Sequence, residues 1–387
     1  MKHNKHCVDS LLMFLPINQS VSPHLLRIFD STPADSEIFG YLVRCIGYIS
    51  SKSPPSAGIV TLHRTNIIID AIRNTLDPSK SITILQGFCR FCDKTNNEEL
   101  IQVLTTFFID YFKAQDDGQP NIPVIKCCMR SFFSLQRATN HITERLSNDL
   151  ESVRKIVQLM LYKGDSKFIE GILLVIRYYC ESDIFVATLL RTNFIVNLLS
   201  LLEEPLCDSE EKIISACYTI LDYVKESAGD SLPLSAFYDL FIRHLCDIKH
   251  GEEVAYVIVY NCNIQEIMEI MAKCEIIPIL LDNISYCPTI SISSVRLLKK
   301  ILSLGSSVET CPEFEGFNPY VLKVAECGGV EVLRSVIKRT NDLIQKINEQ
   351  DVDRDRTADK ILAKYFGEDF ENFMIKRRGN ATKSARK

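Results

Sequence analysis

Thr61-Leu62-His63-Arg64-Thr65-Asn66-Ile67 recurs almost unchanged later in the chain, as Thr188-Leu189-Leu190-Arg191-Thr192-Asn193-Phe194. Apolar residues at helical spacing lie before and after each copy. Asn, like Gly, suits a left-handed helix end or a sharp turn. We therefore expect one helix to stop in each copy and a new helix to begin within the next residue or two. Weaker copies occupy residues 272–281 and 324–333.

The spacing of the copies indicates a repeating unit of about 40 residues. The first two copies are about three such units apart, and the second and third are about two apart. The fourth is displaced by one further unit and an insertion of roughly ten residues. Self-similarity at this period is typical of armadillo and HEAT repeats. We expect an all-α fold, an armadillo/HEAT-like right-handed α-solenoid of about eight helical repeats.

The chain divides by pattern into three parts. Residues 1–23 form a lead-in with no strong periodicity, residues 24–375 a single solenoid domain, and residues 376–387 a basic tail that we expect to be unstructured. No linker rich in proline or glycine interrupts the array. Within it, Asp77 and Pro78 predict a helix start, because Asp caps helices and Pro favours the first helical position.

The composition is that of an ordinary folded protein, with 46% hydrophobic and 24% charged residues. No apolar run approaches the roughly 18 residues of a membrane span. The net charge of −5 does not favour binding to nucleic acid. The composition and the net charge therefore favour neither a membrane nor nucleic acid as the partner.

The 15 cysteines include a single C-x-x-C, formed by Cys89 and Cys92, and no second pair completes a zinc site. Most of the others lie inside apolar helical pattern, where a free Cys behaves as a small buried hydrophobe; examples are Cys45, Cys128, Cys217 and Cys246. This usage predicts a reducing compartment, cytoplasmic and/or nuclear.

The sequence resembles one armadillo family, the importin-α nuclear-import adaptors, best over about residues 150–370. Residues 253–260, 264–267 and 274–280 resemble that family's repeat from groove helix to next junction. Residues 325–330 resemble its last-repeat junction, and residues 361–367 its terminal capping helix. The resemblance implies an armadillo fold and a role in nucleocytoplasmic protein transport.

In importin-α the groove helix of each repeat presents a Trp and, one turn later, an Asn. The resemblance implies that aromatic faces bracket lysine stems of an extended peptide, and that the Asn binds the peptide backbone. This chain contains no Trp. Aligned by eye, the Trp places hold Tyr256, Tyr218, Leu173 and Gln86, and the Asn places hold Tyr260, Asp222, Arg177 and Arg90.

Two sets of side chains on these groove helices are candidate binding residues. An aromatic and acidic set suits a peptide carrying Lys or Arg: Tyr218, Asp222, Tyr256, Tyr260 and Asn261. Alternatively, these tyrosines pack between repeats with only their hydroxyls in water. A basic ladder suits an acidic or phosphorylated segment: Arg44, Arg90, Arg130 and Arg177. The alternative is that these arginines are solvated and balance nearby acids.

The basic tail resembles a two-cluster nuclear localisation signal, formed by Lys376, Arg377, Arg378, Lys383, Arg386 and Lys387. Alternatively, it is only a solubilising end.

The sequence holds no phosphate-binding glycine loop, no H-E-x-x-H motif and no nucleophile elbow. We therefore expect no enzyme, no cofactor and no metal. The predicted function is that of an importin-α-like adaptor, whose partner is a basic peptide segment or a transport carrier. The alternative is an armadillo scaffold or regulatory subunit with a fixed protein partner and no transport role.

Overall fold

The computed structural model describes residues 21–52, 59–93, 95, 97–115, 120–138, 141–162, 165–204, 210–232, 234–286, 292–305, 318–347 and 357–366. Within these residues every regular element is a helix, which confirms the predicted all-α class. The chain falls into two compact units, residues 1–201 with 206–209 and residues 202–205 with 210–387. A single array over residues 24–375 stays a prediction.

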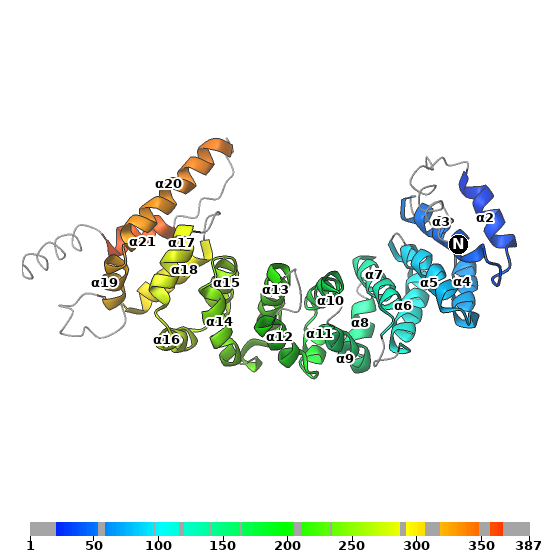
Figure 1. The fold of residues 1–387 in the computed structure, drawn as a ribbon, viewed down its shortest axis with the longest axis horizontal. Coiled ribbons are helices and arrows are strands. Elements are labelled where there is room, and N and C mark those ends of the chain that lie inside the picture. The colour runs from blue at the N-terminus through cyan, green and yellow to red at the C-terminus, as the bar shows by residue number, and fades with distance from the viewer. Residues whose placement is uncertain are drawn as a thin grey trace, which may run out of the picture. The chain divides into compact units, whose positions relative to one another are not determined.

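The described residues of the first unit form a succession of α-helices with one 3-10 turn, η2 (Figure 1). These elements are α2 (Val21–Ser31), α3 (Phe39–Lys52), α4 (Leu62–Asn74), α5 (Pro78–Phe88), η2 (Cys89–Asp93), α6 (Glu98–Lys113), α7 (Ile122–Ala138), α8 (His141–Ser147), α9 (Leu150–Leu159), α10 (Ser166–Tyr179), α11 (Asp183–Leu189) and α12 (Phe194–Glu203).

The second unit continues in the same manner, with two short 3-10 turns, η3 and η4, near its start. Its elements are α13 (Glu210–Ala228), η3 (Gly229–Ser231), η4 (Leu234–Phe237), α14 (Tyr238–Leu245), α15 (Gly251–Asn261), α16 (Ile264–Lys273), α17 (Ile276–Tyr286), α18 (Ile292–Gly305), α19 (Pro319–Glu326), α20 (Gly329–Ile347) and α21 (Thr357–Tyr365).

Each unit arranges its helices in two rows. In the first unit α3 packs against α5, α5 against α7 and α7 against α10, while α4 packs against α6 and α6 against α9. In the second unit one row is α13, α15, α18 and α21, and the other is α14, α17 and α20. Within a row, each helix therefore packs against the helix that occupies the equivalent place about one repeat later in the sequence.

Buried polar side chains join helices about one repeat apart. Asn197 of α12 donates from Nδ2 to the carbonyl oxygen of Val157 in α9 at 2.9 Å, across 40 residues. Asn283 of α17 donates in the same way to Leu245 in α14 at 2.7 Å, across 38 residues. Both acceptors lie in the last turn of a helix, where carbonyl groups have no i+4 partner within the helix. The same chemistry therefore links successive helices in both units.

Several helix starts follow from capping residues in the sequence. Asp77 caps α5 by accepting from the backbone N–H of Ser79 at 2.9 Å, and Pro78 is the first helical residue, as predicted. Asn263 and Glu266 form a reciprocal capping box at the start of α16. Local chemistry thus fixes where these helices begin.

The four sequence copies differ in structure. The first contains no helix end: Thr61 caps α4, which runs through Asn66 to Asn74, so the predicted break there is wrong. A break does follow Leu189, Lys273 and Glu326, as the other three copies predict. Only Gly328 among the described glycines of these junctions has positive φ, at 73°. Cys274, the residue that ends α16, has an extended backbone conformation instead.

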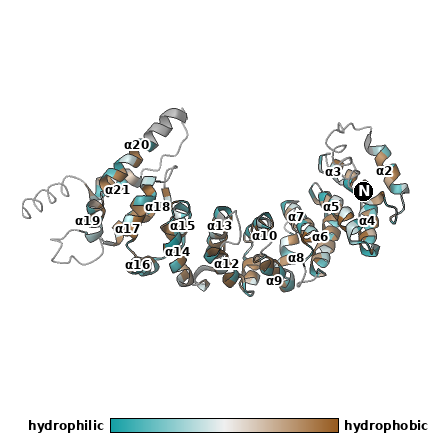
Figure 2. Cartoon of the chain, in the orientation of Figure 1, coloured by the Kyte–Doolittle hydropathy of each residue, from teal (hydrophilic) through white to brown (hydrophobic). Residues whose placement is uncertain are grey.

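The helices carry both apolar and polar residues (Figure 2). The buried side chains include a Phe cluster in the first unit, where Phe88 lies 5.4 Å from Phe107 and 5.5 Å from Phe108 between ring centroids. Among the described residues, no single helix is long and apolar enough to cross a membrane. Helices α11 and α12 pass that test of length and composition only as a pair, with a 78° bend between them.

Candidate functional site

Tyr256 and Tyr260 lie one turn apart on α15 and form an exposed aromatic pair. Their side chains are 43% and 50% exposed, and their ring centroids are 4.6 Å apart. On the neighbouring helix α13, Asp222 accepts a hydrogen bond at Oδ1 from Nδ2 of Asn261, at 2.7 Å. These four residues form what we call the α13–α15 strip. It contains four of the five predicted groove residues.

Tyr218 does not belong to the strip. Its side chain is 1% exposed, and its hydroxyl lies 2.7 Å from Nδ1 of His244. Its ring packs near Phe241, with 6.1 Å between the centroids. The prediction that Tyr218 lines a peptide groove is therefore wrong, and the alternative of a tyrosine packed in the core describes this residue.

A one-residue shift in helix register explains the difference between the two tyrosines. Residues 217–218 and 220–221 of α13 and residues 254–255 and 257–258 of α15 all have at most 1% exposure. Matching these buried pairs places Thr219 in register with Tyr256. Aligning Tyr218 with Tyr256 by eye was off by one position.

The strip has an acidic environment that the sequence reasoning underestimated. The Asp222 carboxylate is the largest cause of a raised pKa at the Tyr256 hydroxyl, followed by burial and then by Tyr260, Glu226 and Tyr223. Tyr223 and Glu226 follow Asp222 by one residue and by one turn on α13. The one-turn spacing from Asp222 was the signal that would have found Glu226. A negative field here favours a cation.

One end of the strip already has a cation. Arg296 of α18 donates from Nη1 to the hydroxyl of Tyr260. This guanidinium disfavours a second positive charge at Tyr260. A basic side chain of a ligand is therefore accommodated best near Tyr256 and Asp222.

Three of the four predicted ladder arginines come together in the first unit. Arg44 of α3, Arg90 of η2 and Arg130 of α7 line one cavity of about 400 Å³, and Lys126 of α7 lines it too. We call it the basic cavity. Arg177 lies on α10, is exposed and is not part of its wall. Three of the arginines thus lie together at a single cavity, whereas the sequence predicts a ladder of four along successive units.

Two of these cations form ion pairs with carboxylates that do not line the cavity. Arg130 donates from Nη2 to Oδ2 of Asp93 at 2.6 Å, and Lys126 donates from Nζ to Oδ2 of Asp165 at 2.5 Å. The guanidinium of Arg90 lies 5.5 Å from the Tyr48 ring centroid. Its Nε is buried and has no hydrogen-bond partner among the described residues.

Two cysteines complete the wall of the basic cavity. Cys89 and Cys127 are both buried, and their thiols are hydrogen-bonded to each other. This bond is the largest cause of a lowered pKa at Cys89, to which Arg130 also contributes, and of a raised pKa at Cys127.

The other cysteine predictions have mixed outcomes. Cys128 and Cys217 are buried as predicted, and Cys45 is half-buried. Cys246 is exposed, so the prediction that it is a core residue is wrong. No group of three potential metal ligands occurs in the part of the chain that the structure describes. The predicted localisation-signal residues of the tail lie outside that part.

Comparison with known proteins supports the fold and is silent on function. No family model and no curated protein matches this chain. A crystal structure of an engineered protein from the Northeast Structural Genomics Consortium matches with a TM-score of 0.60 and 16% identity, over 89% of this chain and 78% of that chain. A second engineered protein from that consortium has a TM-score of 0.43 and 15% identity, over 66% and 95%. The first likeness shows the helical fold alone.

Proposed function

We propose that this chain is a non-enzymatic, protein-binding armadillo-type solenoid of about eight repeats. Hydrogen bonds between helices 38 and 40 residues apart support a repeat of this length. The recurrence of two helix rows in each unit supports stacked repeats rather than an irregular helical fold. The exposed helix surfaces, and not a reactive centre, are then the functional parts.

The single observation that carries the function is the exposed Tyr256–Tyr260 pair beside Asp222. Large apolar rings left in water on a helix row suit the stem of a lysine, and a nearby carboxylate suits its ammonium group. Asn261 adds an amide and a carbonyl within the same strip. We propose that the α13–α15 strip binds an extended peptide segment carrying Lys or Arg.

A strip of this kind supports the role of a divergent importin-α-like adaptor in nucleocytoplasmic protein transport. In this proposal Tyr256 takes the part of the family's tryptophan, and the partners are a basic segment and a transport carrier in the cytoplasm and nucleus.

The alternative is a scaffold or regulatory subunit with one fixed partner. The contact of Arg296 with Tyr260 favours it, because it limits how many consecutive basic side chains the strip accepts. A fixed partner needs only one lysine or arginine at Tyr256. Pull-down from a lysate separates the two versions: the adaptor recovers a transport carrier, whereas the scaffold recovers a single other protein.

Fluorescence anisotropy with a labelled, lysine-rich localisation peptide tests the strip. We expect binding in the micromolar range to the full chain and a loss of at least about two- to fivefold for Tyr256→Ala, because the cation–π contribution alone is about 0.5–1 kcal/mol. Asp222→Asn should weaken binding as well, and the loss should shrink at high salt.

Tyr286→Ala is the matched control. Tyr286 is on α17 in the same unit and is 68% exposed, but it lies outside the strip. Absence of micromolar binding to the full chain, or an equal loss in Tyr286→Ala and Tyr256→Ala, contradicts the proposal.

A further inference from the structure

We propose that the basic cavity of the first unit binds the phosphate group of a phosphorylated serine or threonine in a protein segment. The proposal is separate from the α13–α15 strip. It uses other residues, a ligand of opposite charge and another unit of the chain. The elements that form the cavity, α3, η2 and α7, pack against one another in sequence order.

The side chains that line the cavity concentrate positive charge at one place. Four cations line it, and two carboxylates, Asp93 and Asp165, pair with Arg130 and Lys126. Neither aspartate belongs to the wall. A wall lined by four cations suits the charge of about −1.5 to −2 that a phosphorylated side chain carries at neutral pH.

The donors available in the cavity also fit a phosphate. Guanidinium groups present N–H donors in a planar fork that binds two oxygens of a phosphate at once. Three residues with such groups line the cavity, and they come from three different elements.

Surrounding contacts hold the arginines in place before a ligand arrives. Arg90 stacks by Tyr48, and Arg130 is held by Asp93, whose other oxygen accepts from Ser134 at 2.8 Å. Side chains fixed in this way lose little conformational entropy on binding. Arg90 and Arg130 are therefore positioned before a ligand binds.

The size and the charge of the molecule argue for a protein ligand. A cavity of about 400 Å³ admits one phosphate and its side chain, whereas a nucleic acid needs a basic track many phosphates long. The net charge of −5 on the chain opposes a polyanion. An extended protein segment with one phosphorylated side chain needs no long basic track and carries little negative charge.

The test uses the full chain and a fluorescein-labelled glycine–serine peptide that carries one phosphoserine. Its binding is compared with the same peptide unphosphorylated, with inorganic phosphate as a competitor and with a labelled single-stranded RNA. We expect the phosphopeptide to bind at least tenfold more tightly than the unphosphorylated peptide, and phosphate to compete with it.

Arg90→Gln and Arg177→Gln form a matched pair of variants. Both remove one guanidinium from an equivalent row of helices, but only Arg90 lines the cavity. We expect at least a tenfold loss of phosphopeptide affinity for Arg90→Gln and less than a twofold change for Arg177→Gln. Thermal unfolding of both variants checks that each is folded, and Arg130→Gln provides a second cavity variant should Arg90→Gln unfold.

The thiols of the wall give a readout at the cavity itself. Saturating phosphopeptide should slow alkylation of Cys89 by iodoacetamide, measured by mass spectrometry, and should leave alkylation of the exposed Cys246 unchanged. Tyr256→Ala should bind the phosphopeptide normally, which separates failure of this proposal from failure of the strip. Equal affinity for both peptides, equal losses in Arg90→Gln and Arg177→Gln, or tighter binding of RNA through Arg90 would overturn the proposal.

Discussion

Gly47 of α3 and Gly87 of α5 meet backbone to backbone. A Cβ atom built on Gly47 would lie 2.1 Å from the carbonyl oxygen of Gly87, and one built on Gly87 would lie 2.5 Å from the backbone nitrogen of Arg44. The two helices can approach this closely only without side chains at the contact. This crossing brings Arg44 to the same cavity wall as Arg90, so the basic cavity depends on two glycines.

Gly87→Ala should therefore destabilise the first unit by about 1–3 kcal/mol, the usual cost of overpacking, because backbone atoms have to move apart. Urea unfolding followed by circular dichroism measures the change. Phosphopeptide affinity should fall as well, because the separation of α3 from α5 moves Arg44.

Gly171→Ala is the control for that substitution. Gly171 is in α10, where an added Cβ meets no atom within 4 Å. Ala is the better helix former, so this variant should gain about 0.5–1 kcal/mol. A Gly87→Ala protein as stable as the Gly171→Ala protein would show that the crossing is not tight.

The buried Tyr218–His244 pair predicts a pH dependence of stability. Burial, with repulsion from His250 as the next cause, lowers the pKa of His244 from its ordinary 6.5 to about 4. Between these values the unfolded chain binds a proton that the folded chain does not. The free energy of unfolding should therefore fall as the pH is lowered from about 6.5 to about 4.

Urea unfolding at several pH values, on the natural chain and on His244→Asn, isolates this contribution from that of the carboxylates. Asn keeps a polar partner for the Tyr218 hydroxyl but does not titrate. The natural chain should lose more stability than the variant across the window. Identical pH profiles would mean that His244 is protonated equally in the folded and unfolded states.

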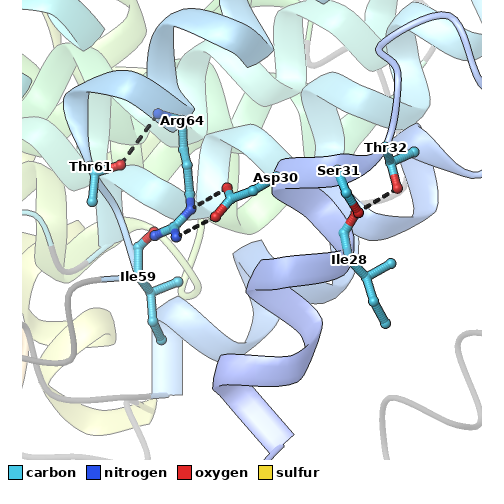
Figure 3. A network of polar contacts seen from close by, with 7 residues as sticks. All are labelled: Ile28, Asp30, Ser31, Thr32, Ile59, Thr61 and Arg64. Carbon is cyan, nitrogen blue, oxygen red and sulfur yellow. Dashed lines mark hydrogen bonds and ion pairs between the residues drawn. The ribbon is translucent and has the colours of Figure 1, made fainter.

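The ion pair between Arg64 and Asp30 ties α4 to α2 (Figure 3). Arg64 donates from Nε to Oδ1 and from Nη2 to Oδ2 of Asp30, both at 2.9 Å, and from Nη1 to the carbonyl oxygen of Ile59 at 3.2 Å. Asp30→Asn should lower the stability of the first unit by about 1 kcal/mol, near the upper end for a partly exposed pair.

The same pair has its own pH signature. The hydrogen bond from Arg64 is the main cause of a lowered pKa at Asp30. Its contribution is therefore present at neutral pH and lost as the pH falls below the ordinary Asp value of 3.8. Asp70→Asn, which changes an exposed carboxylate on α4, is the comparison and should be nearly neutral. Equal effects of the two variants in thermal unfolding would exclude a stabilising Asp30 pair.

The sequence predicts helix starts well where chemistry is local. Asp77 followed by Pro78 and Gly328 before Gly329 mark real boundaries, because capping and positive φ depend on the residues themselves. The first copy of the repeated stretch fails for a tertiary reason. Thr65, Ile68, Ile69 and Ile72 are all buried on one side of α4, so the apolar stripe continues and Asn66 is merely an exposed helical residue.

The candidate sites were predictable only in part. Tyr218 precedes Asp222 by one helical turn, just as Tyr256 precedes Tyr260. Tyr218 is nevertheless buried and Tyr256 exposed, because the register of each helix decides which residues face the core. Arg44, Arg90 and Arg130 share a cavity because α3, η2 and α7 are in contact, which their spacing suggested. Lys126, Cys89 and Cys127 complete that wall through packing that no sequence motif encodes.

Hydrogen–deuterium exchange of the full chain with and without the lysine-rich peptide tests the proposed function most directly. Binding to the strip predicts slower exchange in α13 and α15, around Asp222 and Tyr256, with no change in the basic cavity. Peptide binding that leaves both helices unprotected, or that protects only helices of the first unit, would contradict it.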